Sequence, residues 1–317
     1  MYRIVTVYIV LSSFSFFSQA SSPSISWGMA ARQGQRSHME DTFTCQPLIL
    51  NSATGPAYYI GLFDGHGGTT SSLTAAESAG DMFSDAFTLQ TSAAHLFERI
   101  ERSFLESYRL LDRLIEEKTS DAGTTAVSAL IYDNHLYLAW AGDSRALLIK
   151  KDGIICLETL DHKPLQIHEK KRLESIGQTI TVSLRGPARV GRLAVSRALG
   201  DANEKACLAP GSIICDPEII YAPIEKGDTI VLATDGLWDV LSNKEVAQII
   251  RISKDRSISE LHDLLSFADT TGPLEGREIT SEQTNDESET LVCLARYLRD
   301  SAYTLGSADN ISVAIVT

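Results

Sequence analysis

Short apolar runs, rich in β-branched and aromatic residues and bounded by turn residues, recur along the chain and predict β-strands. A turn that contains Asp precedes or follows nearly all of these runs. The predicted strands are Tyr58–Phe63, His135–Ala141, Ala146–Lys150, Thr229–Thr234 and Ile311–Val316.

The spacing of apolar residues changes to three or four between Ala93 and Glu117 and predicts an amphipathic helix there. A second helix is predicted over Leu165–Ile176, and the capping box Ser242–Glu245 predicts the start of a third. The polar, acidic segment Thr270–Thr290 predicts a surface loop or insertion. Because strands and helices do not alternate regularly, the order favours an α+β fold with antiparallel sheet over a doubly wound one.

The first twenty residues have the layout of a secretory signal peptide. They contain Arg3, an apolar run over Ile4–Leu11, and small residues at Ser18 and Ala20, and no acidic residue precedes Glu40. The apolar run is too short to predict a membrane span. We therefore predict a signal peptide over residues 1–20 and a protein of the secretory pathway. The alternative is an N-terminal strand in a cytosolic or nuclear protein.

Composition narrows the possible functions of the chain. With 317 residues, 44% of them hydrophobic, and a mean hydropathy of -0.02, it is neither disordered nor a multi-span membrane protein. A net charge of -13 argues against nucleic acid as a partner. Five cysteines, an odd number, fit free thiols at least as well as disulfides. The 41 acidic residues raise the question of whether some gather around a cation, since clustered buried carboxylates are otherwise costly.

Carboxylates stand at the ends of several predicted strands. Taken singly, each such segment would be an ordinary turn. Taken together, they would converge on one point, where oxygen ligands suit Mg²⁺ or Mn²⁺ better than zinc. The segments are Glu40-Asp41, Asp64-Gly65-His66-Gly67-Gly68, Asp161-His162-Lys163-Pro164, Asp235-Gly236-Leu237-Trp238-Asp239 and Asp309-Asn310.

Eight strings of residues appear in the order of one family's motifs. They are RSHMED at 36–41, GLFDGHGG at 61–68, AGTTA at 122–126, AWAGDSRALL at 139–148, LDHKP at 160–164, LAVSRALGD at 193–201, LATDGLWDV at 232–240 and SADNISV at 307–313. From Trp27 to Thr317 the chain resembles the metal-dependent protein serine/threonine phosphatases of type 2C. The resemblance implies two stacked antiparallel β-sheets flanked by α-helices, an αββα sandwich. Residues 21–317 would then form one catalytic domain, with a flap near 177–200 and the polar insertion near 270–290.

The resemblance also implies a pair of Mg²⁺ or Mn²⁺ ions that share an attacking water. Asp64 would bridge both ions, Asp235 and Asp309 would hold the first, and Glu40 with the carbonyl of Gly65 would hold the second.

Further residues match family positions with other roles. Asp161 and Asp239, with Asp235, resemble ligands of a weaker third metal site. Asp41 would orient the water, Arg36 would bind phosphate oxygens, and His66 would protonate the leaving alkoxide as a general acid.

The implied activity is hydrolysis of phosphoserine and phosphothreonine in phosphoprotein substrates by a monomeric enzyme. The alternative is an inactive type 2C-like pseudophosphatase that acts as a binding module. A cysteine-dependent phosphatase is excluded because the five residues between Cys293 and Arg299 contain no Gly and read as helix.

Overall fold

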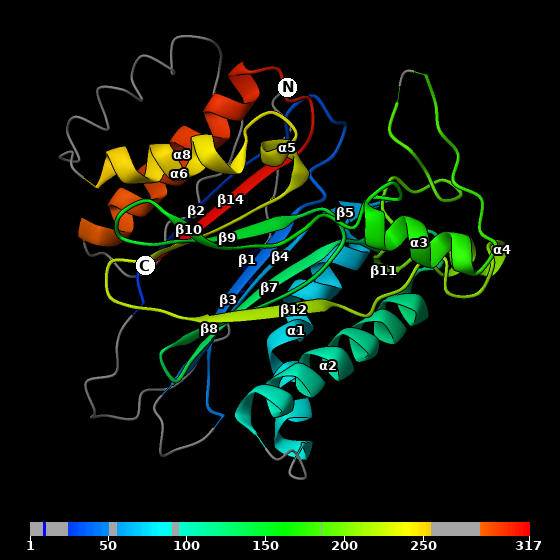
Figure 1. Cartoon of the computed structure of the whole chain (residues 1–317), viewed down its shortest axis with the longest axis horizontal. Helices are drawn as coiled ribbons and strands as arrows, with labels where there is room; N and C mark the ends of the chain where they lie inside the picture. The colour runs from blue at the N-terminus through cyan, green and yellow to red at the C-terminus, as the bar shows by residue number, and fades with distance from the viewer. Residues whose placement is uncertain (1–8, 11–24, 51–55, 91–94, 185, 255–285) are drawn as a thin grey trace, which may run out of the picture.

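Two stacked β-sheets form the centre of the computed structural model, which describes residues 9–10, 25–50, 56–90, 95–184, 186–254 and 286–317 (Figure 1). The larger sheet has six strands in the order β1-β3-β4-β7-β8-β12. All its pairings are antiparallel except that of β1 with β3. Its strands are β1 (Ile9–Val10), β3 (Thr42–Leu48), β4 (Ala57–Phe63), β7 (Ala126–Tyr132), β8 (His135–Ala141) and β12 (Glu218–Pro223).

The smaller sheet has five antiparallel strands in the order β10-β9-β13-β14-β2. These are β2 (Trp27–Arg32), β9 (Arg145–Ile149), β10 (Ile155–Glu158), β13 (Thr229–Ala233) and β14 (Ile311–Val316). A third sheet, which the sequence patterns did not predict, joins three two-residue strands, β5 (Gly65–His66), β6 (Gly123–Thr124) and β11 (Leu199–Gly200).

Helices cover the outer face of each large sheet (Figure 1). Helices α1 (Thr70–Leu89) and α2 (Leu96–Lys118) lie against the six-stranded sheet. Helices α5 (Asp235–Trp238), α6 (Asn243–Ser253) and α8 (Asp286–Thr304) cover the five-stranded sheet. Helices α3 (Ile167–Ser175) and α4 (Ala202–Cys207) lie at one end of the sandwich. The predicted α+β sandwich is confirmed.

The central strands are apolar on both faces because each face packs against a different layer. In β4, Ile60 and Leu62 point into the core between the sheets, whereas Tyr59 and Phe63 point toward α1 and α2. All four side chains are fully buried. The chain therefore reads there as an unbroken apolar run rather than an alternating one.

The predicted elements agree with the observed ones to within about three residues at their ends. The capping box at Ser242 is present, with both of its reciprocal hydrogen bonds. The predicted loop over 270–290 is wrong at its end, because α8 begins at Asp286, and the rest of that segment lies outside the described residues. The predicted signal peptide also lies outside them, except for β1. No helix in the described part of the chain is long and apolar enough to cross a membrane.

Candidate metal centre and active site

The strand register brings carboxylates of both sheets to one end of the sandwich. Thr42 of β3 pairs with Phe63 of β4, so that Asp41 and Asp64, the next residues outward, are neighbours. In the other sheet, Thr234 N donates to Ser312 O (3.1 Å) just beyond the last β13–β14 pair, and this contact sets Asp235 beside the residues that precede β14.

The cluster also includes Asp309, just before β14, and a fifth aspartate, Asp143, from the turn between β8 and β9. Arg145 pairs with Ala233 across β9 and β13, which places this turn next to Asp235. The charge of Asp143 acts on both Asp64 and Asp235. Sequence reasoning missed Asp143, although it lies within the AWAGDSRALL string that the resemblance had singled out.

Burial and mutual repulsion make the carboxylate cluster unusual electrostatically. Burial, followed by repulsion from neighbouring carboxylates, raises the pKa of Asp64 and of Asp235 well above the ordinary value. Burial also raises the pKa of Asp41 to about 7, with a contribution from Asp309. For Asp143 burial raises the pKa to about 6, although Lys163 opposes the rise.

Two carboxylate oxygens of this cluster are orphaned. Asp41 Oδ1 and Asp235 Oδ1 are buried and have no hydrogen-bond partner among the described residues. Buried acceptors without partners are costly, and divalent cations would satisfy them. The donor set, carboxylate and carbonyl oxygen alone, fits Mg²⁺ or Mn²⁺.

Close backbone packing holds the candidate ligands Glu40 and Gly65 together. A Cβ added at Gly65 would meet Glu40 O at 2.6 Å and Ser72 Oγ at 2.8 Å, so only glycine fits. Ser72 Oγ donates to Glu40 O (2.5 Å), and Asn310 Oδ1 accepts from Glu40 N (2.8 Å). Asn310, next to Asp309, therefore ties the two loops to each other.

Arg36 lies at the rim of the cluster. Its Nη2 donates to Asp309 Oδ2 (2.5 Å), and its side chain is 59% exposed. A planar guanidinium with one edge engaged keeps further donors for phosphate oxygens.

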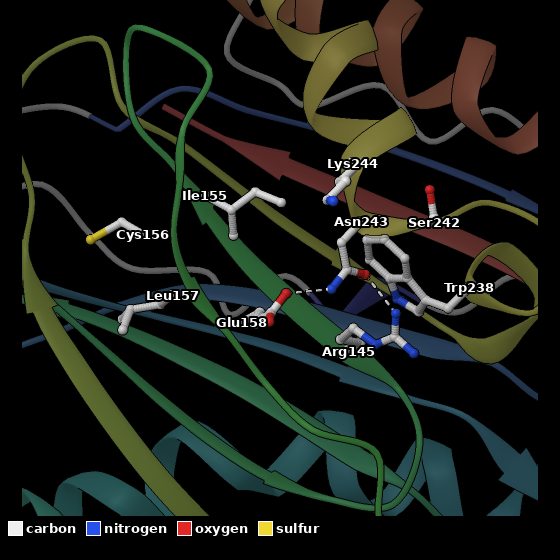
Figure 2. Close-up of a pocket in the computed structure, with 9 residues that line it drawn as sticks. All are labelled: Arg145, Ile155, Cys156, Leu157, Glu158, Trp238, Ser242, Asn243 and Lys244. Atoms are coloured by element: carbon white, nitrogen blue, oxygen red, sulfur yellow. Dashed lines mark hydrogen bonds between the residues drawn. The ribbon is translucent and has the colours of Figure 1, made fainter.

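Asp161 makes a bidentate ion pair instead of lying free in the cluster. Its two oxygens accept from Arg145 Nε and Nη2, both at 2.9 Å. Arg145 Nη1 also donates to Asn243 Oδ1 (2.6 Å). The side-chain amide nitrogen of Asn243 in turn donates to Glu158 (Figure 2). The geometry therefore favours Asp143 over Asp161 as a metal ligand, and Arg145 serves in an ion pair.

His66 has a carboxylate partner that sequence reasoning also missed. Its Nε2 lies 2.9 and 2.8 Å from the two oxygens of Asp201, a residue with a left-handed backbone (φ +58°). Gly123 allows this approach, because a Cβ there would lie 2.0 Å from Asp201 Oδ2 and 2.6 Å from His66 Nε2. Asp201 ends the LAVSRALGD string, which was the available signal.

A second group of possible metal ligands, formed by His162, Glu169 and Glu218, has a structural role instead. Its possible ligand atoms lie within 4.8 Å of one another. However, Gly142 N–H donates to His162 Nδ1 (3.2 Å), so the neutral ring carries its proton on Nε2 and cannot coordinate a metal there. Arg197 donates to both glutamates. His162 and Arg197 therefore serve the packing of this region.

Comparison with known proteins agrees with this geometry. The family model described as Protein phosphatase 2C matches residues 25–269. The chain belongs to this family. Helix α8 and strand β14, beyond the matched residues, complete the phosphatase 2C sandwich of this chain.

Relatives in the phosphatase 2C family include two curated proteins. The chain is 38% identical over 241 residues to Protein phosphatase 1L of Bos taurus, covering 71% of this chain and 62% of that protein. It is 28% identical over 307 residues to Protein phosphatase 2C 56 of Arabidopsis thaliana, covering 92% and 67%. The chain thus spans about two thirds of the length of these relatives.

Solved structures share the fold. A C. elegans sex determining protein has a TM-score of 0.69 at 27% identity, covering 94% of this chain and 65% of that one. Serine-threonine phosphatase 2C from Toxoplasma gondii has a TM-score of 0.64 at 20% identity, covering 94% and 96%.

The raised pKa values predict how pH affects the stability of the metal-free phosphatase 2C domain. The pKa is about 7 for Asp41 and about 6 for Asp143 in the folded chain, against 3.8 for the free side chain. Between about pH 4 and about pH 7 the folded state therefore binds more protons than the unfolded state, and raising the pH favours unfolding. In EDTA, we expect the Tm to fall by roughly 5 °C or more from about pH 5 to about pH 8.

Thermal unfolding monitored by circular dichroism measures this effect. Millimolar Mn²⁺ should flatten the dependence, because the ions replace protons at the same carboxylates. A Tm that rises with pH in EDTA over this range would contradict the electrostatic account.

Proposed function

We propose that this chain is a protein serine/threonine phosphatase that requires Mg²⁺ or Mn²⁺. The observation that carries the proposal is the convergence of five aspartates, two with orphaned buried oxygens, at one end of a phosphatase 2C sandwich. Divalent cations bound there would neutralise the carboxylates and polarise a phosphate ester. The substrates would be phosphoserine and phosphothreonine in proteins.

Two ions would be held by the ligand set that the resemblance implied. Both Asp64 and Asp235 face the other carboxylates from opposite sheets, which supports this assignment. For a third, weaker ion we propose Asp143 in place of Asp161, together with Asp235 and Asp239. The repulsion that Asp143 and Asp239 exert on Asp235 supports that choice.

Other residues would bind the phosphate and activate water. Arg36 would hold phosphate oxygens through the donors that Asp309 leaves free. Asp41 would orient the attacking water through Oδ1, a buried oxygen without a hydrogen-bond partner among the described residues. Its position is fixed by the hydrogen bond from Thr234 Oγ1 to Asp41 Oδ2 (3.2 Å).

His66 would donate a proton to the departing serine or threonine oxygen. It is partly exposed, with a side-chain exposure of 32%, whereas Asp201 behind it is buried. A carboxylate in that position orients the ring. Asp201 is therefore a positioning residue.

Hydrolysis of a phosphothreonine peptide tests the proposal. The full chain should release phosphate with Mn²⁺ or Mg²⁺ and lose at least about a hundredfold in rate in EDTA. Turnover that persists in EDTA would exclude the metal-assisted mechanism. A folded chain that binds Mn²⁺ but does not turn over would favour the alternative, a pseudophosphatase that acts as a binding module.

We also propose that the chain enters the secretory pathway, on the pattern of Met1–Ala20. Cleavage after Ala20 would remove β1 and leave β3 as the edge of the six-stranded sheet. Sequencing the N-terminus of the protein from its native cells tests this, and a retained Met1 would refute it in favour of the cytosol or nucleus.

A further inference from the structure

Lys163 places an ammonium group against the outer side of the carboxylate cluster. Its Nζ donates to Asp239 Oδ1 (3.1 Å) and lies 3.7 Å from both Asp143 Oδ2 and Asp161 Oδ2. Asp161 is already neutralised by Arg145, as described above. The ammonium therefore serves mainly Asp143 and Asp239.

Three carboxylates surround the ammonium of Lys163, those of Asp143, Asp161 and Asp239. Its charge also acts on Asp235. Among the described residues, Lys163 is thus a cation that acts on the candidate ligands Asp143, Asp235 and Asp239 at once.

The backbone around Lys163 is fixed while its side chain has room to move. His162 N donates to Gly142 O (2.9 Å), its ring stacks on Trp140, and Gln166 N donates to Lys163 O (2.9 Å). The Lys163 side chain is 39% exposed and borders a cavity of about 420 Å³. Glu158, which lines this cavity, is a second acceptor that a displaced ammonium could meet.

We propose that Lys163 is a tethered cation that occupies the outer position of the metal centre and must be displaced before a third divalent ion binds to Asp143 and Asp239. This inference rests on the proposed function, because it presupposes a metal centre at these carboxylates. An ammonium and a divalent ion cannot share the same oxygens without strong repulsion. Lys163 would therefore determine how tightly the outermost ion binds, and leave the inner ions largely unaffected.

Mn²⁺ binding to the full chain tests this, with free Mn²⁺ measured by electron paramagnetic resonance. Lys163→Met removes the charge but keeps the length of the side chain, and should tighten the weakest Mn²⁺ by at least about tenfold. Lys163→Arg keeps the charge and should bind Mn²⁺ as the wild type does. Adding Asp143→Asn to Lys163→Met should abolish the gain.

A matched control is Lys150→Met. Lys150 forms a comparable ion pair with Asp228 (2.6 Å) between β9 and the turn before β13, and its loss should leave Mn²⁺ binding unchanged. Lys163→Gln, which also removes the charge, should tighten the weakest Mn²⁺ as Lys163→Met does. Thermal unfolding in EDTA checks that each variant is folded.

The outcomes separate this inference from the proposed function. If every variant retains the tightly bound ions, and if wild type and Lys163→Met bind the weakest ion equally, the proposed role of Lys163 is overturned. The proposed metal centre would stand. Absence of Mn²⁺ binding by the folded wild type at millimolar concentration would overturn the proposed metal centre, and the role of Lys163 with it.

Discussion

Replacement of Asp64 by Asn should lower phosphopeptide turnover by about a thousandfold or more and, at the same time, stabilise the metal-free protein. Asp64 follows β4 at the centre of the cluster, where its pKa is raised by burial and by the charges of Asp41, Asp235, Asp143 and Asp309. A neutral amide ends these repulsions. Each unit by which the pKa of Asp64 is displaced corresponds to about 1.4 kcal/mol of difference between its charged and neutral forms. The same change removes the carboxylate expected to bridge two ions.

Two measurements on the Asp64→Asn variant decide the matter: turnover with saturating Mn²⁺, and Tm in EDTA at about pH 8. We expect the Tm in EDTA to rise by roughly 5 °C, and its increase on adding Mn²⁺ to shrink. The matched control is Asp216→Asn, which removes an exposed carboxylate paired with Arg109 of α2. A variant that keeps wild-type turnover, or whose Tm in EDTA falls, would show that Asp64 does not serve as a repelled metal ligand.

Loss of His66 should produce a defect that depends on the leaving group. His66→Ala should slow hydrolysis of a phosphothreonine peptide by about a hundredfold or more, because the alkoxide of threonine needs a proton to depart. Hydrolysis of p-nitrophenyl phosphate should change far less, since nitrophenolate leaves readily as an anion. Asp201→Asn should give the same selectivity with a smaller loss, because it removes the partner of His66 Nε2 and not the proton donor itself.

Steady-state kinetics on both substrates measure this selectivity. His135→Ala is the matched control, since His135 lies at the start of β8, at the opposite end of that strand from Asp143. Equal losses on the two substrates would argue for a structural role of His66. Unchanged hydrolysis of the peptide would remove it from the mechanism.

Local patterns were sufficient to predict most central elements of this fold. Strands β4, β8, β9, β13 and β14 are mostly apolar because both of their faces are buried. Helix α2 shows its amphipathic spacing because one face packs on the sheet. The capping box at Ser242 is likewise a contact within four residues. Features whose cause lies within one element can be recognised along the chain.

Other elements left weaker local signals. Helix α1 was missed because it is rich in Ala, Ser and Gly and buries small residues, so its apolar spacing is faint. Strand β12 lies at a sheet edge and is only partly buried, which weakens its pattern. The strands of the third sheet have two residues each, and they exist only because their neighbours hold them.

The carboxylates, glycines and histidines at the strand ends of this protein are evident from its sequence, and their motif order was enough to indicate the family and the inner metal ligands. The partner of each charged group is evident only from the folded chain. Asp161 pairs with Arg145, Asp143 joins the cluster, Asp201 lies behind His66, and Lys163 faces the outer carboxylates. Strand register and the packing of two sheets set these partners, because they join residues that are far apart in the chain. The Coulomb energy of two charged groups depends on their separation in space rather than along the sequence.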